Sequence, residues 1–314
     1  MKKVLILLLA SIFIFAACSN GNSKPEEPEQ TPASTTTTTG TENSGTEGSG
    51  GEEGNNQGGE TTGTRPEVSG KIGKYESPYE VGDIVFNDGS AMPFTENLTL
   101  TQEQKDSAIA IIFFKGTDLN NGDDTTTCRT LGVGLKHSSE PLAWCKYTDN
   151  RWYNNAQAYY IEITTIGEDD IKNGSENLER IGAFLSTYED TYGDFYLEGI
   201  PYSVSDDTAE ESNYPAFYFA KNYNTIATNL GTTYSSGWYF PSYAELFYLF
   251  FKNKNFDIDA ASNLCGGDQF GTKWYGASSQ FIMMDSKVLK FTFGKGSGCD
   301  KKDANYVCAI REFN

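Results

Sequence analysis

The sequence predicts an α+β domain of short, twisted antiparallel strands and at least two helices, which follows a disordered tether. A helix with clear start signals begins near Pro241. Apolar and polar residues alternate in short segments towards residue 314, as is typical of strands. The composition also changes near residue 75, where a polar stretch gives way to about 240 residues, enough for one substantial core.

The helix is predicted from the segment GWYFPSYAELFYLF, residues 237–250. Pro241 occupies a first-turn position where a missing N–H costs little. Ser242 and Glu245 have the spacing of a capping box. Leu246, Leu249 and Phe250 then recur at helical spacing, so this helix should be buried on a wide face.

Strands are predicted after this helix. Leu289, Phe291 and Phe293 alternate with more polar residues, which indicates a strand with one buried face. Cys308 and Ile310 share a face in the last segment. A helix followed by a short-strand meander indicates a mixed α+β domain.

These segments also carry a family resemblance. The order WYFPSYAEL, KWYGASSQ, an aromatic strand and VCAIREF resembles the C-terminal half of a C-type-lectin-like domain. The subclass is the bacterial one related to formylglycine-generating enzymes. Within it, the chain resembles spirochaete surface lipoproteins that include a treponeme variable protein diversified by a retroelement. The resemblance covers residues 81–313 in layout and 237–313 in motif.

One departure from this family concerns the segment after the Trp-Tyr pair. Relatives read W-S-S-S there, whereas this chain has Tyr275, Gly276, Ala277, Ser278 and Ser279. Since Gly276 replaces a large aromatic residue, we expect the local surface to differ.

The N-terminus predicts an exported lipoprotein. Lys2 and Lys3 precede an apolar run, residues 4–17, that is shorter than the ~20 residues of a membrane-spanning helix. Small residues directly precede Cys18, as lipoprotein signal peptidase requires. We therefore expect residues 1–17 to be a signal peptide and Cys18 to be acylated, for example with palmitate. The alternative is an ordinary cleaved signal with an incidental cysteine.

Residues 18–74 predict a disordered tether and residues 75–314 the C-type-lectin-like domain. The tether is rich in Gly, Ser, Thr and Glu and has almost no apolar side chains to bury. It should extend the domain away from the membrane. The expected location is the outer membrane or cell surface, with the periplasmic face as the alternative.

The first half of the domain predicts a series of short elements. A hairpin is expected over Val81–Phe94, with a turn at Asn87–Gly89. A polar helix over Leu100–Ser107 and a buried strand over Ala108–Lys115 should follow. Asp118–Asp124 has the carboxylates of a calcium loop, but its glycine falls one place early, so we expect a turn. Later elements are short strands over Leu131–Leu135 and Ala143–Cys145, a helix through Leu178–Leu185, an acidic loop over Asp190–Asn213, and a helix from Pro215.

The charge excludes one class of partner. The chain has 24 basic and 43 acidic residues and a formal net charge of −19, with no Lys/Arg cluster. Nucleic acids and polyanionic glycans are therefore poor partners. The expected ligand is therefore a protein or a neutral glycan on another cell or surface.

Six cysteines in an exported chain suggest disulfides. Assigning Cys18 to lipid leaves five. The family resemblance implies a staple between Cys265 and Cys308, and Cys128 with Cys145 would close a shorter loop. Cys299 would be left over. The alternative is that all are reduced.

The sequence favours a non-enzyme. His137 is the single histidine, and no nucleophile–base pair accompanies it, so we assign no catalytic residues, cofactor or metal ligands. Formylglycine-generating enzymes use a nearby pair of cysteines on copper. Cys299 and Cys308 are the candidates here, but their spacing is wider.

The ligand-binding surface is expected within Gly276–Asp300, because the equivalent segment forms the exposed ligand face in the variable proteins. A solvent-facing Phe-Ile-Met-Met run would make a protein-binding hot spot. The alternative is that these four residues form a core strand. The predicted ligand-binding residues are Gly276, Phe281, Ile282, Met283, Met284, Asp285, Lys287, Ser297, Cys299 and Asp300.

Three functions follow as hypotheses. The first is a surface lipoprotein that binds a ligand as an adhesin or receptor, with retroelement diversification as an option. The second is an enzyme of the formylglycine-generating type. The third is a structural envelope lipoprotein without a ligand.

Overall fold

The computed structural model of the protein describes residues 65–145, 172–181, 214–252, 256–282, 285–290 and 295–313, with the backbone alone for 281–290 and 295–297. These residues lie in one compact unit, Thr62–Asn314. The unit has the predicted mixed α+β character, with antiparallel sheets and a few helices. The signal peptide, Cys18 and most of the expected tether lie outside the described residues.

The described elements follow one another along the chain as three sheets and several short helices. The strands are β1 (Asp83–Phe86), β2 (Ala91–Pro93), β3 (Ala108–Gly116), β4 (Arg129–His137), β5 (Leu142–Ala143), β6 (Trp238–Tyr239), β7 (Trp274–Ile282), β8 (Asp285–Lys290), β9 (Lys295–Asp300), β10 (Ala304–Asn305) and β11 (Cys308–Glu312). The helices are α1 (Gln102–Ser107), α4 (Pro215–Lys221), the 3₁₀ turn η2 (Tyr223–Thr225), α5 (Tyr243–Phe247), the π-helical turn η3 (Tyr248–Lys252) and α6 (Ile258–Leu264), and residues 177–181 are also helical.

The main sheet has six strands in the order β2-β1-β3-β4-β11-β6. Every neighbouring pair in it is antiparallel. Strand β11 lies inside the sheet, since Ile310 is opposite Val133 of β4 on one side and Tyr239 of β6 on the other. The segment VCAIREF therefore joins the two halves of the domain.

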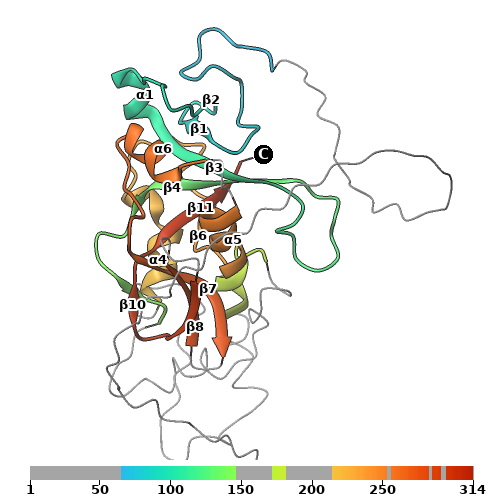
Figure 1. The fold of residues 1–314 in the computed structure, drawn as a ribbon, viewed down its shortest axis with the longest axis vertical. Helices are drawn as coiled ribbons and strands as arrows, with labels where there is room; N and C mark the ends of the chain where they lie inside the picture. The colour runs from blue at the N-terminus through green and yellow to red at the C-terminus, as the bar shows by residue number, and fades with distance from the viewer. Residues whose placement is uncertain are drawn as a thin grey trace, which may run out of the picture. The chain divides into compact units, whose positions relative to one another are not determined.

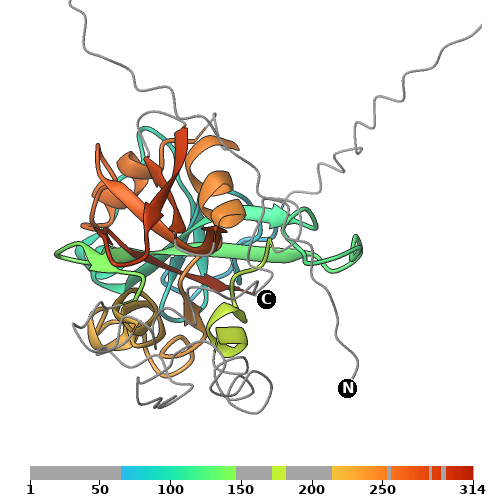
Figure 2. The same cartoon turned by 90° about the horizontal axis from the view of Figure 1, so that it is seen from below.

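Both faces of the main sheet are buried. One apolar cluster packs Val85 and Ala309 with α4, and the other packs Phe86 and Ile310 with α5 and α6. Figure 2 shows the orange helices α5 and α6 on one side of the green strands and the ochre helix α4 on the other. This two-sided burial explains why Ala108–Phe114 is a continuous apolar run.

A three-stranded sheet, β7-β8-β9, lies beside the main one. In Figure 1 its strands β7 and β8 are at the opposite end of the domain from α1. A small pair, β10 with β5, completes the strands of the described residues.

Several predicted elements are confirmed. The hairpin β1–β2 turns at Asn87–Gly89, where Gly89 has a φ of 85°. Helix α1 and strands β3, β4 and β11 lie where the sequence placed them. The helix from Pro215 also forms as α4.

Three details differ from prediction. Helix α5 is shorter than expected, because the chain changes to a π-helical turn at Tyr248. Helix α6 was not predicted, although Asp257 caps it by accepting a hydrogen bond from the Ala260 N–H at 2.9 Å. Strand β8 runs from Asp285 to Lys290 and so begins before Leu289, the first apolar residue of the predicted alternation, while Phe291 and Phe293 lie outside the described residues. The acidic loop 190–213 lies outside the described residues.

Residues 65–74, which the sequence assigned to the tether, contact the domain. Arg65 forms an ion pair of 2.8 Å with the fully buried carboxylate of Asp83. Its guanidinium also lies 4.1 Å from the centre of the Tyr75 ring, and Glu67 forms a β-bridge with Tyr75. The composition of residues 65–74 did not indicate that the folded domain begins before residue 75. The contacts that join this segment to the domain involve few residues, chiefly Arg65 and the β-bridge between Glu67 and Tyr75.

The two predicted disulfides are wrong, since the structure has Cys128, Cys145, Cys265 and Cys308 as free thiols. Cys128 is exposed, whereas Cys145 is buried in the cluster that contains α4. Cys265 and Cys308 are both buried in the other cluster, where each fills space as a small apolar residue. Burial raises the pKa of the Cys145 and Cys265 thiols to about 12.

We predict that thiol labelling of the unreduced, folded chain modifies Cys128 rapidly. Cys145, Cys265 and Cys308 should react only as the domain unfolds, because the thiolate is the reactive form and burial disfavours it. The measurement is the time course of reaction with an aromatic disulfide reagent, with and without guanidinium. A Cys128→Ser variant should lose one thiol from the fast phase, and the partly exposed Cys299 should account for fast reaction that remains among the described cysteines. Finding two fewer reactive thiols in the denatured, unreduced chain would show a disulfide and contradict the structure.

Candidate ligand-binding surface

The predicted ligand-binding residues meet on the sheet β7-β8-β9. Strand β8 pairs with both of its neighbours, and Asp285 lies opposite Asp300 of β9. Lys287 and Val288 lie opposite Gly298 and Ser297. The backbone thus brings Asp285, Lys287, Ser297, Cys299 and Asp300 together on two adjacent strands. Met283 and Met284 lie outside the described residues, as do the side chains of Phe281 and Ile282.

Gly276 does not belong to an exposed surface, contrary to prediction. It is buried on β7, and a Cβ atom there would lie 3.2 Å from the Phe240 ring. The missing side chain therefore makes room for an internal aromatic ring. The absence of a side chain at Gly276 therefore changes the packing inside the domain, and it affects the outer surface only through that packing.

The serines that follow Gly276 are also buried and organise the start of α5. The Ser278 N–H donates to the carbonyl of Pro241 at 2.7 Å. The Ser279 hydroxyl accepts from the Tyr243 N–H at 2.9 Å. The Ser278 carbonyl also accepts from the Trp144 indole at 3.2 Å. Residues 275–280 of β7 are thus buried and structural, whereas Trp274 at the start of the strand is exposed.

A buried ion pair holds these elements in place. The Glu245 carboxylate is fully buried and lies 3.2 Å from the Arg129 guanidinium. The same carboxylate accepts from the Tyr239 hydroxyl at 2.7 Å, from the Ser242 N–H at 2.8 Å and from the Gly174 N–H at 3.2 Å. The predicted capping box is confirmed, but its glutamate also binds β4, β6 and the segment at residue 174.

Arg129 completes this polar cluster from the end of β4. Its guanidinium donates to the Leu119 carbonyl at 2.7 Å and to the Asn173 side chain at 3.1 Å. It also contacts the half-exposed carboxylate of Glu312 on β11 at 3.3 Å. Burial raises the pKa of Glu245, and the neighbouring guanidinium and N–H donors oppose that rise.

The turn after β9 supports the end of the predicted surface. Asp300 accepts from the Lys302 N–H at 3.1 Å and pairs with the Lys302 ammonium at 2.8 Å. Lys301 turns inward and is fully buried, with its ammonium 4.4 Å from the centre of the Trp144 ring. The Asn305 amide lies 3.5 Å from the Cys299 sulfur. Sequence reasoning missed Lys301, because its burial depends on a tryptophan far away in the chain.

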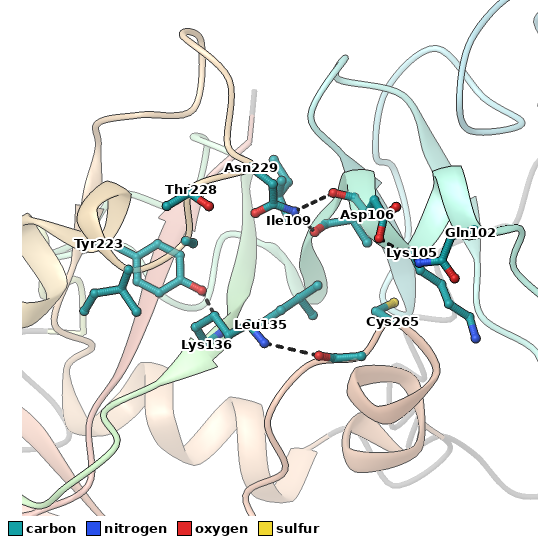
Figure 3. Close-up of a pocket in the computed structure, with 14 residues that line it drawn as sticks. Gln102, Lys105, Asp106, Ile109, Leu135, Lys136, Tyr223, Thr228, Asn229 and Cys265 are labelled. Carbon is teal, nitrogen blue, oxygen red and sulfur yellow. Dashed lines mark hydrogen bonds between the residues drawn. The ribbon is translucent and has the colours of Figure 1, made fainter.

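A recess of about 360 Å³ lies elsewhere, between α1, β4 and the segment after η2 (Figure 3). The Asn229 amide donates to the carbonyls of Asp106 and Ala108 at 3.0 and 2.9 Å. The Tyr223 hydroxyl accepts from the Lys136 N–H at 2.7 Å, and the Lys136 ammonium donates to the Gly266 carbonyl at 3.2 Å. These polar groups of the recess therefore bind one another across its walls.

His137 is a core residue in this structure. Its ring is packed 4.3 Å from that of Phe270, and its Nδ1 lies 2.7 Å from the Tyr275 hydroxyl. Burial lowers its pKa to about 3. The imidazole therefore stays neutral at ordinary pH.

Neither cysteine of the possible copper pair is set in a metal-binding group among the described residues. Cys308 is completely buried on β11, and burial raises the pKa of its thiol. The loop Asp118–Asp124 forms the expected turn, in which the Asp124 carboxylate accepts from the Thr126 and Thr127 N–H groups at 2.9 and 3.1 Å. Within the described ranges, no helix has the length and apolar character needed to cross a bilayer.

No family model and no curated protein matches the chain. Among solved structures, a fimbrial protein from Bacteroides ovatus ATCC 8483 has a TM-score of 0.45 and 15% identity. The match covers 75% of this chain and 49% of that one, so the chain spans about half the length of the fimbrial protein. A likeness of this degree decides neither fold family nor function.

We predict that Glu245→Ala destabilises the domain by about 3–5 kcal/mol. The change leaves the buried Arg129 without its main carboxylate and removes the acceptor of the Ser242, Gly174 and Tyr239 groups. The matched control is Glu312→Ala, which removes the half-exposed partner of the same arginine and should cost less than about 1 kcal/mol. Urea unfolding followed by circular dichroism measures both. Equal losses would show that the buried carboxylate has no special role.

We also predict that His137 makes the domain less stable in acid. The unfolded histidine takes up a proton below a pKa of about 6.5, whereas the folded one does so only near 3. Its contribution is therefore complete above pH 6.5 and is lost as the pH falls, by up to about 1.4 kcal/mol per pH unit. The single histidine should give one imidazole NMR signal that does not titrate between pH 7 and 4.5. A His137→Gln variant should show a shallower loss of stability over that range, and a mid-point near 6.5 in the folded chain would refute the prediction.

Proposed function

We propose that this chain is a membrane-anchored, exported lipoprotein with a C-type-lectin-like domain that binds a protein or glycan ligand, as an adhesin or receptor. The anchor is the acylated Cys18, and the tether up to about residue 64 carries the domain away from the membrane. The ligand surface is the outer part of β8 and β9, with the turn at Asp300.

One observation carries the proposal: the residues of the family motif do structural work, while the segment between them is a separate sheet. Ser242, Glu245, Ser278 and Arg311 are all joined to other segments by hydrogen bonds. Strands β8 and β9 belong to a sheet distinct from the main six-stranded one. The motif residues would keep the fold constant, and β8 and β9 would carry the binding residues. This division allows the binding residues to vary while the fold is retained.

The partner class follows from the charge. With a net charge of −19, the chain repels polyanions at long range. A protein or neutral glycan ligand meets no such barrier. Retroelement diversification of this surface belongs to the proposal, on the strength of the resemblance alone.

We predict that cells displaying the full chain adhere to surfaces coated with fibronectin or with a neutral glycan that lacks sialic acid and sulfate. The double variant Lys287→Ala/Asp300→Ala should lower adhesion about tenfold, because it removes a charge from each of the adjacent strands β8 and β9. The matched control is Glu103→Ala/Lys105→Ala on α1, at the opposite end of the domain. Bound cells per area give the readout.

One further strain completes that test. Cys18→Ser should abolish palmitate incorporation and release the chain from the membrane, with loss of adhesion. If the wild-type chain adheres no better than the Cys18→Ser strain on both coatings, the adhesin function is wrong and the structural envelope lipoprotein takes its place.

A further inference from the structure

A second recess, of about 250 Å³, lies against the π-helical turn η3. Its walls come from α5, η3, the turn that contains Asp118, and Lys172. It is distinct from the β8–β9 surface, and none of its lining residues belongs to that sheet. π-Helical turns are rare and are frequently found at functional sites.

Aromatic rings form one wall of this recess. Phe247 and Tyr248 are adjacent where α5 becomes η3, and both are half-buried. The Tyr248 ring is held in an edge-to-face contact with Phe114, at 5.1 Å between ring centres. Phe247 stacks near Tyr243 at 6.4 Å. The rings are therefore positioned by the core and present part of their surface to the recess.

Charged groups of both signs face these rings. The Tyr248 hydroxyl donates to the Asp118 carboxylate at 2.8 Å. The Lys252 ammonium lies 5.9 and 5.8 Å from the centres of the Phe247 and Tyr248 rings, a cation–π distance for each. Lys172 also lines the recess. Burial and the hydrogen bond to Asp118 raise the pKa of Tyr248 to about 12, so its hydroxyl keeps its proton.

The polar cluster of Arg129 and Glu245 holds this recess open. Arg129 binds the Leu119 carbonyl directly after Asp118, and Glu245 lies within α5. The Ser242 hydroxyl donates to the Lys172 carbonyl. The Asn173 N–H donates to Asn121 at 2.8 Å, which joins the Asp118 turn to the Lys172 segment. The recess is therefore built before any ligand arrives.

We propose that this recess binds one ring of a neutral sugar. The apolar C–H face of a pyranose would lie on Phe247 and Tyr248, with its hydroxyls bonded to Asp118, Lys252 and Lys172. The volume is below the roughly 300 Å³ at which pockets for drug-sized ligands begin, so a single ring is a suitable occupant.

The mixture of donor and acceptor groups selects this ligand class. Sugar hydroxyls both donate and accept, and so satisfy a carboxylate and two ammonium groups together. A purely apolar ligand would displace water from the exposed Asp118 and Lys252 without replacing its hydrogen bonds. An anionic ligand would meet Asp118 and the field of a chain with net charge −19.

Saturation-transfer NMR on the full chain tests this, with methyl β-glucoside, methyl β-galactoside, methyl α-mannoside and N-acetylglucosamine as probes. We expect transfer to at least one sugar, with a dissociation constant on the order of 1–10 mM for so few atoms. Asp118→Asn and Lys252→Gln should each weaken binding about three- to tenfold, and Tyr248→Ala should abolish it. The matched control is Asp123→Asn, an exposed carboxylate of the same turn that does not line the recess.

The outcomes separate this site from the proposed adhesion surface. The Lys287→Ala/Asp300→Ala variant should bind the sugars as the wild type does, whatever its adhesion. The proposal is overturned if none of the four sugars shows transfer. It is also overturned if transfer persists undiminished in both Asp118→Asn and Lys252→Gln, or if it disappears in Lys287→Ala/Asp300→Ala. If Tyr248→Ala fails to fold, the two exposed charge variants decide.

Discussion

The contact between Arg129 and Glu245 is the interaction on which the rest of this domain depends. Removing two charges from water is expensive, and the cost is offset only if the pair has excellent geometry and further hydrogen bonds. Here the carboxylate has four partners and the guanidinium five, drawn from β4, β6, α5, β11 and two loops. Each element must be in place before the pair is satisfied. The main effect of the ion pair is therefore to favour one arrangement of the chain over others. Its contribution to the net free energy of folding is the smaller effect.

This arrangement separates the frame of the domain from its proposed binding surfaces. The serines of β7 lie within the segment where the ligand surface was expected, but their hydroxyl and backbone groups form hydrogen bonds with α5 and neighbouring segments. The motif therefore identifies the frame, and it says nothing about which ligand the domain takes. Candidate binding residues are therefore sought on β8 and β9, which belong to a sheet separate from the main one, and at the recess beside η3.

Local signals in the sequence predicted much of the fold. The capping box at Ser242, the apolar run of β3 and the Asn87–Gly89 turn each depend on residues within one segment, and all three formed as expected. The failures share a different origin. The thiol state of Cys265 and Cys308 and the burial of Gly276 depend on what packs against them from distant segments. The recess at η3 was equally hidden, because Asp118 and Tyr248 are 130 positions apart in the chain.

The position of β11 has a consequence for how the protein is made. This strand lies between β4 and β6, yet it follows both of them in the sequence. Until residues 308–312 have been synthesised, β4 and β6 each present an unpaired edge, and the two halves of the domain share no sheet. The sheet can therefore close only around a chain translated through β11. A frameshift or stop codon anywhere in β7–β9 would remove this strand as well, so a folded main sheet requires an intact reading frame through residues 274–300.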